Sequence, residues 1–379
     1  MQWRVPYFDL KLDEDDKKAV REVLDSNWLT MGAATQEFET RFADLLKVKH
    51  SLAVSNCTVA LHLANILSGI GPGDEVICPA LTFVATANAV LYTGGVPIFA
   101  DITSETDWTI SPDSIVENIT PRTKAIIVVH YGGYPCDMQE IMKIAQENNL
   151  TVIEDCAHAL VTEYDGKFLG TFGKFGCFSF FGNKNMTTAE GGMIITNDDS
   201  AAERVKLLRS HGMTNLTLDR FKGHAFSYDV VDLGYNYRID EMRAALGVSQ
   251  LNKLSYNNAR RHQIVKLYCR LLEDVDELVI PFTDKMDNAS SHIFPVLLPE
   301  GSDRFGVMTR LKELGVQTSI HYKPIHLFDH YVRNKIGNNR PLPKIESLWE
   351  RILTLPLYPG MLEADVEYVA SSLKDALGS

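Results

Sequence analysis

The segment Thr151-Val152-Ile153-Glu154-Asp155 decides the fold. Its β-branched residues favour a strand, and its apolar part shows no alternation with polar residues. Strands that are buried on both faces have this pattern, and they occur in parallel sheets that helices cover. Several other short runs of the chain are also rich in Val and Ile. The sequence therefore predicts an α/β fold.

The neighbouring runs extend this strand into a sheet. From about Asp13 to Leu251, strand-like runs alternate with apolar helical patterns, which is typical of a mainly parallel sheet covered by helices. The segment Tyr164-Asp165-Gly166-Lys167 has the Asp-Gly signal of a tight hairpin turn. The seven predicted strands of the main sheet are His50 to Ser55, Glu75 to Cys78, Val96 to Asp101, Lys124 to His130, Thr151 to Asp155, Gly176 to Phe180 and Gly192 to Thr196.

The last third of the chain has a different pattern. A chain of 379 residues exceeds the size at which one hydrophobic core keeps growing. We therefore expect a large domain over residues 1–254 and a smaller α+β domain over residues 255–379. The predicted elements around and beyond this boundary are helices at about Ile239 to Leu254 and Asn257 to Leu272, a strand near His292 to Leu298, a helix near Asp303 to Leu314, a strand near Val316 to Tyr322 and a helix at about Glu363 to Leu377.

The composition is that of an ordinary soluble enzyme. Hydrophobic residues make up 45% of the chain and charged residues 23%. The net charge of -12 opposes nucleic-acid binding, which depends on basic surface. No apolar run reaches the roughly 18 residues that a membrane-spanning helix needs, so we expect no membrane partner. The segment Met1 to Tyr7 lacks the features of a signal peptide, which predicts a cytoplasmic protein.

The six cysteines are widely scattered and form no C-x-x-C pair. This distribution argues against a disulfide framework and against a structural zinc site. We therefore expect reduced, mostly buried thiols and no metal.

Lys184 is the residue that carries most information about chemistry. It ends the run Phe178-Ser179-Phe180-Phe181-Gly182-Asn183-Lys184. A lysine amine becomes a nucleophile where partial desolvation or a nearby cation lowers its pKa, and imines of pyridoxal phosphate (PLP) are the commonest use of that chemistry. Taken alone, a solvated loop lysine is the simpler interpretation. The PLP interpretation therefore depends on finding the other parts of such a site.

Asp155 is the candidate partner of the cofactor's ring nitrogen. It ends the predicted strand 151–155, and ligands of open α/β sheets bind beyond the carboxyl ends of the strands. A carboxylate at that place keeps the nitrogen protonated, so that the ring accepts electrons. The alternatives are that Asp155 only caps a turn, or that Glu154 is the acid, since side chains alternate along a strand and only one of the two faces the site.

A phosphate cup and a stacking surface complete the candidate site. Residues 55–62 follow a strand and open a helix, so free N–H groups and the Thr58 hydroxyl lie at a helix N-terminus that suits phosphate. The alternative is that Thr58 or Asn56 is only an N-cap. Phe83 follows another strand end and can lie against one face of the ring, with Ala157 on the other. The alternative is that Phe83 belongs to the core.

Taken together, these motifs resemble the DegT-type nucleotide-sugar aminotransferases over nearly the whole chain. Several ordered motifs in one chain are more specific than any single one. The segments that carry the resemblance are Glu154-Asp155-Cys156-Ala157-His158-Ala159, the run to Lys184 followed by Glu190-Gly191-Gly192, Gly234-Tyr235-Asn236-Tyr237-Arg238, Trp28-Leu29-Thr30-x-Gly32, residues 121–133 and His321-Tyr322-x-Pro324-x-His326.

The resemblance implies the PLP-dependent transferase type I fold, as in aspartate aminotransferase, and a homodimer with active sites shared between subunits. It makes Lys184 the imine lysine and Asp155 the ring-nitrogen partner, and it decides against Glu154. The cofactor contacts that it implies are Cys57 (backbone), Thr58, Phe83, Ala157, His158 near the ring hydroxyl, Ser179 and Asn236, which reaches the cofactor phosphate of the neighbouring subunit. The candidate substrate contacts are Trp28, Thr30, Tyr322 and His326, although the last two also suit a cover over the domain junction.

Three positions depart from the commonest pattern of the family. They are Cys57, the pair Gly182-Asn183 before the lysine, and Ala189 before Glu190. None of these departures removes a catalytic group. They weaken any inference about which sugar fits, because residues beside Lys184 line the substrate side of the pocket.

The expected reaction is transamination in two halves. L-glutamate gives its amino group to the cofactor, and a nucleotide-linked keto-sugar, above all a 4-keto sugar, then receives it and leaves as an amino sugar. Lys184 is expected to be both the tether and the general acid/base. Alternatives are a cyclitol ketone aminotransferase with the same motifs, and a PLP-dependent sugar dehydratase, in which His would replace Lys184. A PLP-binding regulator is the alternative that is not an enzyme, and it would have lost the lysine or the aspartate.

Overall fold

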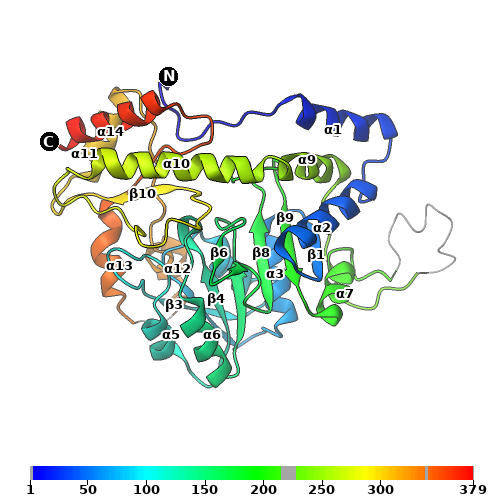
Figure 1. The fold of residues 1–379 in the computed structure, drawn as a ribbon. Helices are drawn as coiled ribbons and strands as arrows, with labels where there is room; N and C mark the ends of the chain where they lie inside the picture. Colours follow the sequence, from blue (N-terminus) through cyan, green and yellow to red (C-terminus); the bar gives the residue numbers. More distant parts are fainter. Residues whose placement is uncertain (1–2, 215–227, 338–339, 379) are drawn as a thin grey trace.

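The computed structural model describes residues 3–214, 228–337 and 340–378 (Figure 1). Its centre is one sheet of seven strands in the order β1-β9-β8-β5-β4-β2-β3. Strand β9 runs antiparallel to both of its neighbours, and the remaining neighbours pair in parallel. The strands are β1 (His50–Val54), β2 (Glu75–Pro79), β3 (Val96–Ala100), β4 (Thr123–Val129), β5 (Thr151–Asp155), β8 (Phe175–Ser179) and β9 (Gly192–Thr196).

All seven predicted strands are confirmed, and their ends differ from the prediction by no more than one residue. The expected hairpin is also present as β6 (Glu163–Tyr164) and β7 (Lys167–Phe168), which pair antiparallel. Its turn residues Asp165 and Gly166 both have positive φ angles, 49° and 73°. A two-residue type I′ turn needs these angles, and Asp-Gly accepts them at low cost.

Helices cover both faces of the sheet, because each strand buries both of its faces. Along β4, Ala125 and Ile127 belong to one apolar cluster, and Ile126 and Val128 to the other. The first cluster includes residues of α3 (Cys57–Leu67), α4 (Ala85–Leu91) and α7 (Asp199–Leu208). The second includes residues of α2 (Ala33–Leu46), α5 (Pro112–Asn118), α6 (Met138–Glu147) and α9 (Glu241–Leu251). The predicted α/β class is thus confirmed as a three-layer arrangement.

The long helix α10 (Leu254–Leu272) lies beyond one end of the sheet and leads to the last part of the chain (Figure 1). The helices predicted at about 239–254, 257–272, 303–314 and 363–377 are confirmed as α9, α10, α11 (Arg304–Glu313) and α14 (Glu363–Leu377). Shorter helices α12 (Asp329–Arg333) and α13 (Pro343–Leu348) lie between α11 and α14 in sequence, and α1 (Glu14–Ser26) precedes α2. The division of the chain at residues 254 and 255 stays a prediction.

One predicted strand of this part is wrong. Residues 316–322 form no strand and make only isolated bridges, Val5 with Val316 and Ser319 with Thr354. The strand predicted near 292–298 is present as β10 (Phe294–Leu297), and it pairs antiparallel with β11 (Ile352–Leu355), which the sequence did not reveal. Segment 316–322 is therefore irregular chain that packs beside this two-stranded sheet.

The beginning of the chain packs against this C-terminal part. Val5 is fully buried and forms a parallel bridge with Val316. The backbone N–H of Val5 donates to Gly315, and that of Gln317 donates to Val5. The Arg4 guanidinium lies 3.3 Å from the centre of the Tyr368 ring in α14, so residues 4–5 contact segments more than 300 positions later in the chain.

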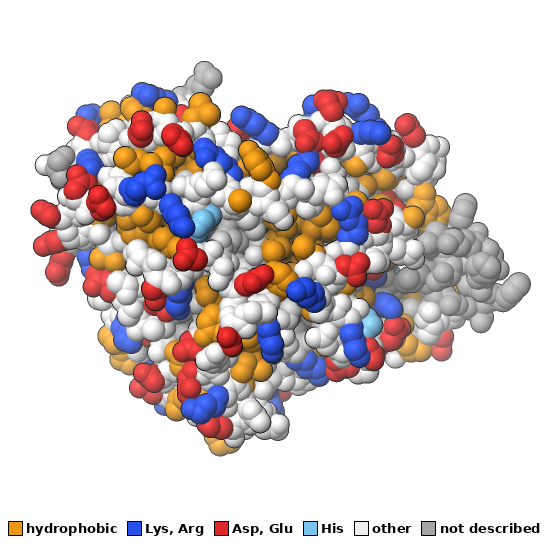
Figure 2. Space-filling model, in the orientation of Figure 1, with side chains coloured by type: hydrophobic (Ala, Val, Ile, Leu, Met, Phe, Trp, Pro, Cys, Tyr) orange, Lys and Arg blue, Asp and Glu red, His pale blue; other side chains and the backbone are white. Residues whose placement is uncertain are grey.

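Acidic and basic side chains are interspersed over the face of the molecule that Figure 2 shows. Apolar side chains lie between them in several patches. Within the described ranges, no helix combines the length and the apolar character that crossing a membrane requires.

Candidate active site

A cavity of about 770 Å³ lies where the parallel strands end. Val129, Asp155 and Ser179, the last residues of β4, β5 and β8, line it. Loops that follow β1 and β2 supply further walls, because the carboxyl ends of parallel strands meet at one edge of the sheet. The sequence-predicted site residues that line this cavity are Cys57, Thr58, Phe83, Asp155, Ala157, His158, Ser179, Lys184 and Tyr322.

Lys184 lies in a turn that follows β8, where its backbone N–H donates to Phe181 O at 2.9 Å. The residue is partly buried and its side chain lines the cavity. Burial lowers the pKa of the Lys184 amine to about 8, although Asp155 and Cys57 oppose the shift. The neutral, nucleophilic form of the amine is therefore a much larger fraction near neutral pH than it is for a solvated loop lysine.

Asp155 faces the cavity with both carboxylate oxygens held in place. Oδ1 accepts the backbone N–H of Ala157 at 3.1 Å, and Oδ2 accepts the Thr86 hydroxyl at 2.9 Å. Burial raises the pKa of the Asp155 carboxyl, while these two hydrogen bonds and Lys184 oppose the rise. Such a buried acceptor suits a cationic N–H group in the cavity, since a charged partner would offset the burial of the carboxylate.

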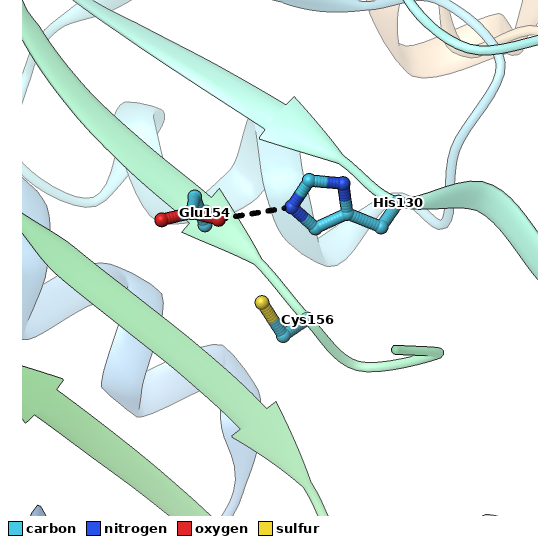
Figure 3. Close-up of side chains that lie close together, drawn as sticks. All are labelled: His130, Glu154 and Cys156. Atoms are coloured by element: carbon cyan, nitrogen blue, oxygen red, sulfur yellow. Dashed lines mark hydrogen bonds and ion pairs between the residues drawn. The ribbon is translucent and has the colours of Figure 1, made fainter. Parts of the chain in front are cut away.

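Glu154 points to the opposite side of β5, as the alternation along a strand requires. Oε1 accepts the backbone N–H groups of Phe172 and Gly173, and Oε2 accepts that of Gly170. The His130 ring nitrogen Nε2 lies 3.1 Å from Oε2 (Figure 3). Glu154 therefore anchors a backbone turn outside the cavity.

His130, Glu154 and Cys156 lie close enough together to suggest a metal site, and all three are buried (Figure 3). Their hydrogen bonds argue against one. His130 Nδ1 accepts the backbone N–H of Cys136 at 3.3 Å, which leaves the ring hydrogen on Nε2, where it faces Glu154. Burial also raises the pKa of the Cys156 thiol well above its usual range, so the sulfur stays protonated. His130 and Glu154 thus form a buried structural hydrogen bond, and the Cys156 thiol lies beside them.

One end of the cavity is the N-terminus of α3, where the sequence predicts phosphate binding. Asn56 is the N-cap, and its side chain accepts the Val59 N–H at 3.0 Å. Thr58 is therefore not the cap, and it lines the cavity. The N–H groups in the first turn of a helix have no partner inside the helix, so those of Cys57 and Thr58 suit an anion. Ser179 supplies a second hydroxyl to the same cavity.

Gly192 lets the sheet approach this helix end closely. A Cβ atom on Gly192 would lie 2.4 Å from the carbonyl carbon of Asn56 and 2.6 Å from the nitrogen of Cys57. Any side chain there would push the first turn of α3 away. The glycine of the Glu190-Gly191-Gly192 motif thus shapes the cup.

The side walls of the cavity are aromatic and imidazole rings. The Phe83 side chain is a large apolar group that is 57% exposed, so it belongs to the cavity wall and not to the core. His158 Nδ1 accepts the Gly132 N–H at 3.2 Å, which leaves the ring hydrogen on Nε2, 3.2 Å from the Tyr322 hydroxyl. Burial, with Lys184 nearby, lowers the pKa of His158 well below its usual value, so the ring is neutral.

Four predicted contacts do not line the cavity in a single chain. His326 lies in a short 3-10 helix, and its Nε2 is 3.1 Å from Glu346 Oε1. Asn236 is exposed. Trp28 and Thr30 lie in the loop before α2, and Thr30 is exposed. The cofactor and substrate contacts predicted for these four residues therefore stay predictions.

Glu241 fixes the end of the loop that contains Trp28 and Thr30 and leads into α2. Its Oε1 accepts the N–H groups of Gly32 and Thr35 and the Thr35 hydroxyl, at 2.7, 2.9 and 2.6 Å. Its Oε2 accepts the Ala34 N–H at 2.7 Å. One buried carboxylate thus serves as the cap of α2, where the backbone offers free donors.

Sequence reasoning missed His292. Its ring nitrogen Nε2 lies 3.3 Å from Lys184 Nζ, and its Nδ1 lies 3.0 Å from Asn185 Oδ1. His292 directly precedes the apolar run of β10, and a polar residue at the start of a strand carries no local signal of function. Only the position of Asn185 beside Lys184 could have drawn attention to that side of the lysine.

The cavity offers the kinds of groups that PLP needs. An amine with a lowered pKa, a buried carboxylate, an aromatic face and a helix N-terminus with two hydroxyls converge on it. The buried Oδ1 atom of Asn183, at the same wall, lacks a hydrogen-bond partner. The residues of this chain therefore fit the cofactor.

This fold and this donor set define a PLP-dependent aminotransferase of fold type I. The model of the DegT/DnrJ/EryC1/StrS aminotransferase family matches residues 10–374, and the chain belongs to that family. It is 37% identical over 376 residues to the spore coat polysaccharide biosynthesis protein SpsC of Bacillus subtilis, with 98% of this chain and 96% of that protein covered.

Solved structures agree with this assignment. Helicobacter pylori PseC, an aminotransferase involved in the biosynthesis of pseudoaminic acid, matches with a TM-score of 0.91 and 32% identity, covering 100% of both chains. DesV of S. venezuelae, solved in complex with a ketimine intermediate, matches with a TM-score of 0.90 and 31% identity over 99% of both chains. The protein is thus a PLP-dependent sugar aminotransferase, and the interpretation as a PLP-binding regulator is set aside.

Proposed function

We propose that the protein transfers the amino group of L-glutamate to a nucleotide-linked keto-sugar, with a 4-keto sugar as the first candidate. The observation that carries the proposal is the position of Lys184 and Asp155 in one cavity with the α3 N-terminus. That arrangement suits a cofactor that accepts and returns an amino group. The relation to PseC and SpsC supports a sugar as the acceptor.

PLP, when bound, supplies a carbonyl group that takes up an amino group and a ring that stabilises a carbanion. The residues of the chain then have separate tasks. Lys184 would tether the cofactor, and its amine, once freed, would act as the general acid/base at the substrate carbon. Asp155 would hold the ring nitrogen and favour its protonated form. Its hydrogen bonds from Thr86 and Ala157 hold the carboxylate in that orientation.

The remaining side chains of the cavity would bind and enclose the cofactor. Thr58, Ser179 and the first N–H groups of α3 would hold the phosphate. Phe83 and Ala157 would contact the cofactor ring. His158 is oriented by Gly132 and Tyr322, and its Nε2–H is directed toward Tyr322, which lies in the same wall. Tyr322 is the substrate contact that the cavity itself supports.

A homodimer with shared active sites is part of the proposal. Asn236 is exposed, and the segment before it presents large apolar side chains to solvent, among them Tyr228, Val230 and Leu233 at 58%, 57% and 80% exposure. A second subunit that covers this segment would bury that apolar surface. It would also bring Asn236 toward the neighbouring phosphate. A cytoplasmic location stays a prediction.

The experiment converts the purified protein to its pyridoxamine form with L-glutamate and then offers a panel of keto compounds. The panel contains nucleotide-linked 4-keto and 3-keto sugars, free keto-sugars and a cyclitol ketone. Return of the imine absorbance with a nucleotide-linked sugar alone supports the proposal. Return with the cyclitol ketone alone would replace it with the cyclitol alternative, and loss of the sugar hydroxyl without amination would indicate a dehydratase.

The Lys184→Ala variant tests the residue assignment. It is expected to bind PLP without forming the imine absorbance and to show no turnover. Normal turnover in this variant would refute the role of Lys184.

A further inference from the structure

We propose that His292 is a positioning residue that accepts a hydrogen bond from the free amine of Lys184 and fixes the direction of that amine during proton transfer. This inference rests on the proposed role of Lys184. His292 lies on the strand-like segment before β10, in the C-terminal third of the chain, whereas Lys184 follows β8 of the main sheet. The contact therefore joins two parts of the fold at the reacting atom.

The tautomer of His292 follows from its partners. Asn185 Nδ2 donates to the carbonyl oxygen of Ser290 at 2.7 Å, and a carbonyl only accepts. The same nitrogen lies 2.8 Å from Asn258 Oδ1, and Asn258 is itself oriented by donating to Leu160 O. Asn185 Oδ1 must therefore face His292 Nδ1, which carries the ring hydrogen.

His292 Nε2 is consequently a bare acceptor, 3.3 Å from Lys184 Nζ. The ring is held by its hydrogen bond to Asn185 and by its burial, and the backbone of His292 is also fixed on both sides. His292 N donates to Gly132 O at 2.8 Å, and Arg261 Nη1 donates to His292 O at 3.0 Å. The side chain is nearly fully buried. A rigid acceptor thus faces a flexible lysine side chain.

His292 acts as an acceptor and not as a base. Burial lowers its pKa well below the ordinary value, and Lys184, His158 and Arg261 lower it further. It therefore stays neutral at the pH at which Lys184 changes its charge. With one N–H of the lysine directed at His292, the rest of the amine is constrained to fewer directions in the cavity. Proton transfer depends on such alignment.

The first test compares His292→Phe, which removes the acceptor at similar size, with His292→Gln, which offers a new acceptor. His292→Phe is expected to lower kcat of the glutamate half-reaction by about 10-fold to 100-fold, while KM for glutamate and the PLP dissociation constant change by less than about 3-fold. His292→Gln should recover part of kcat. A merely structural role would instead change the binding constants and the melting temperature together.

The second test needs no turnover. Competitive acetylation of the apoprotein, followed over pH by peptide mass spectrometry, reports the apparent pKa of Lys184. A neutral acceptor stabilises the ammonium form more than the amine, so its loss should move the labelling midpoint of Lys184 about one pH unit lower. The other charged or titratable groups that influence Lys184 are Asp155, Cys57, Arg261, His158 and His321, and they are unchanged in these variants.

Two further variants complete the design. Asn185→Ala keeps His292 but releases its Nδ1, so it should shift both readouts in the same direction by a smaller amount. If His292→Phe fails to fold, Asn185→Ala still tests the inference. His50→Gln is the control, because His50 pairs with Asp199 at the start of β1, at the other end of the sheet.

An unchanged kcat and an unchanged labelling midpoint in His292→Phe and Asn185→Ala would overturn the inference. This failure is separate from failure of the proposed function, which turnover by Lys184→Ala would reveal. If Lys184→Ala proved active, the labelling experiment alone would still decide whether the hydrogen bond exists.

Discussion

Replacing Glu241 with Gln should loosen the N-terminus of α2 by about 2 to 4 kcal/mol. The carboxylate accepts four hydrogen bonds there, three at Oε1 and one at Oε2. The amide oxygen of Gln can keep the three bonds at Oε1, but the amide NH₂ then faces the Ala34 N–H. An unpaired donor costs about 1 to 3 kcal/mol, and loss of the negative charge at a helix N-terminus costs about 0.3 to 2 kcal/mol.

Hydrogen exchange of the peptide that covers residues 29–38 measures this change directly. A loss of about 2 to 4 kcal/mol corresponds to exchange that is about 30-fold to 1,000-fold faster at the first amides of α2. The matched control is Asp240→Asn, one residue earlier, because Asp240 caps α9 with a single backbone bond to Arg243 N and Asn is an equally good cap. Unchanged exchange in Glu241→Gln, or equal acceleration in both variants, would refute the reasoning.

If Trp28 and Thr30 contact substrate, KM for the sugar should rise in Glu241→Gln alone.

Three further predictions concern the cofactor site. Gly192→Ala should weaken PLP binding by at least 10-fold in an absorbance titration, because the new Cβ would overlap the backbone of Asn56; unchanged affinity would contradict the close approach. Thr86→Val removes a donor to the Asp155 carboxylate and so favours its protonated form. The acid limb of kcat/KM against pH should therefore move upward by about one to two pH units, and a downward move would show that the sign is wrong. Phe83→Ala should raise the PLP dissociation constant by about 2-fold to 10-fold, yet leave the melting temperature of the apoprotein unchanged, because the ring is exposed in the single chain.

The sheet could be predicted because its signal is local. Strands such as 151–155 and 192–196 have apolar runs of strand length, and breakers or polar residues bound them, so their ends were placed within one residue. Segment 316–322 contains strand-favouring Val, Thr, Ile and Tyr but no apolar run, and β10 pairs instead with β11, which ends just before Pro356. Which of two short runs joins a sheet depends on packing between distant segments, and local composition does not carry that information.

The residues of the site also differ in how far the sequence could predict them. Residues at strand ends, such as Asp155 and Ser179, are brought together by the sheet itself, so their meeting could be foreseen. His292 contacts Lys184 from 108 positions further along the chain, because the C-terminal part packs against the site, and no spacing in the sequence predicts that contact. The role predicted for Asn236 would need a second subunit, so it stays a prediction.

The bridge between Val5 and Val316 has a consequence for synthesis on the ribosome. The segment that starts the chain must wait for its partner until about 310 further residues have been made, and this takes roughly 15 to 60 s at ~5 to 20 residues per second. The sheet and its helices can form during that interval, whereas the first residues stay unpaired until late. Translation pauses or premature stops after α10 should therefore yield nascent chains whose beginning is open to proteases although their centre is folded.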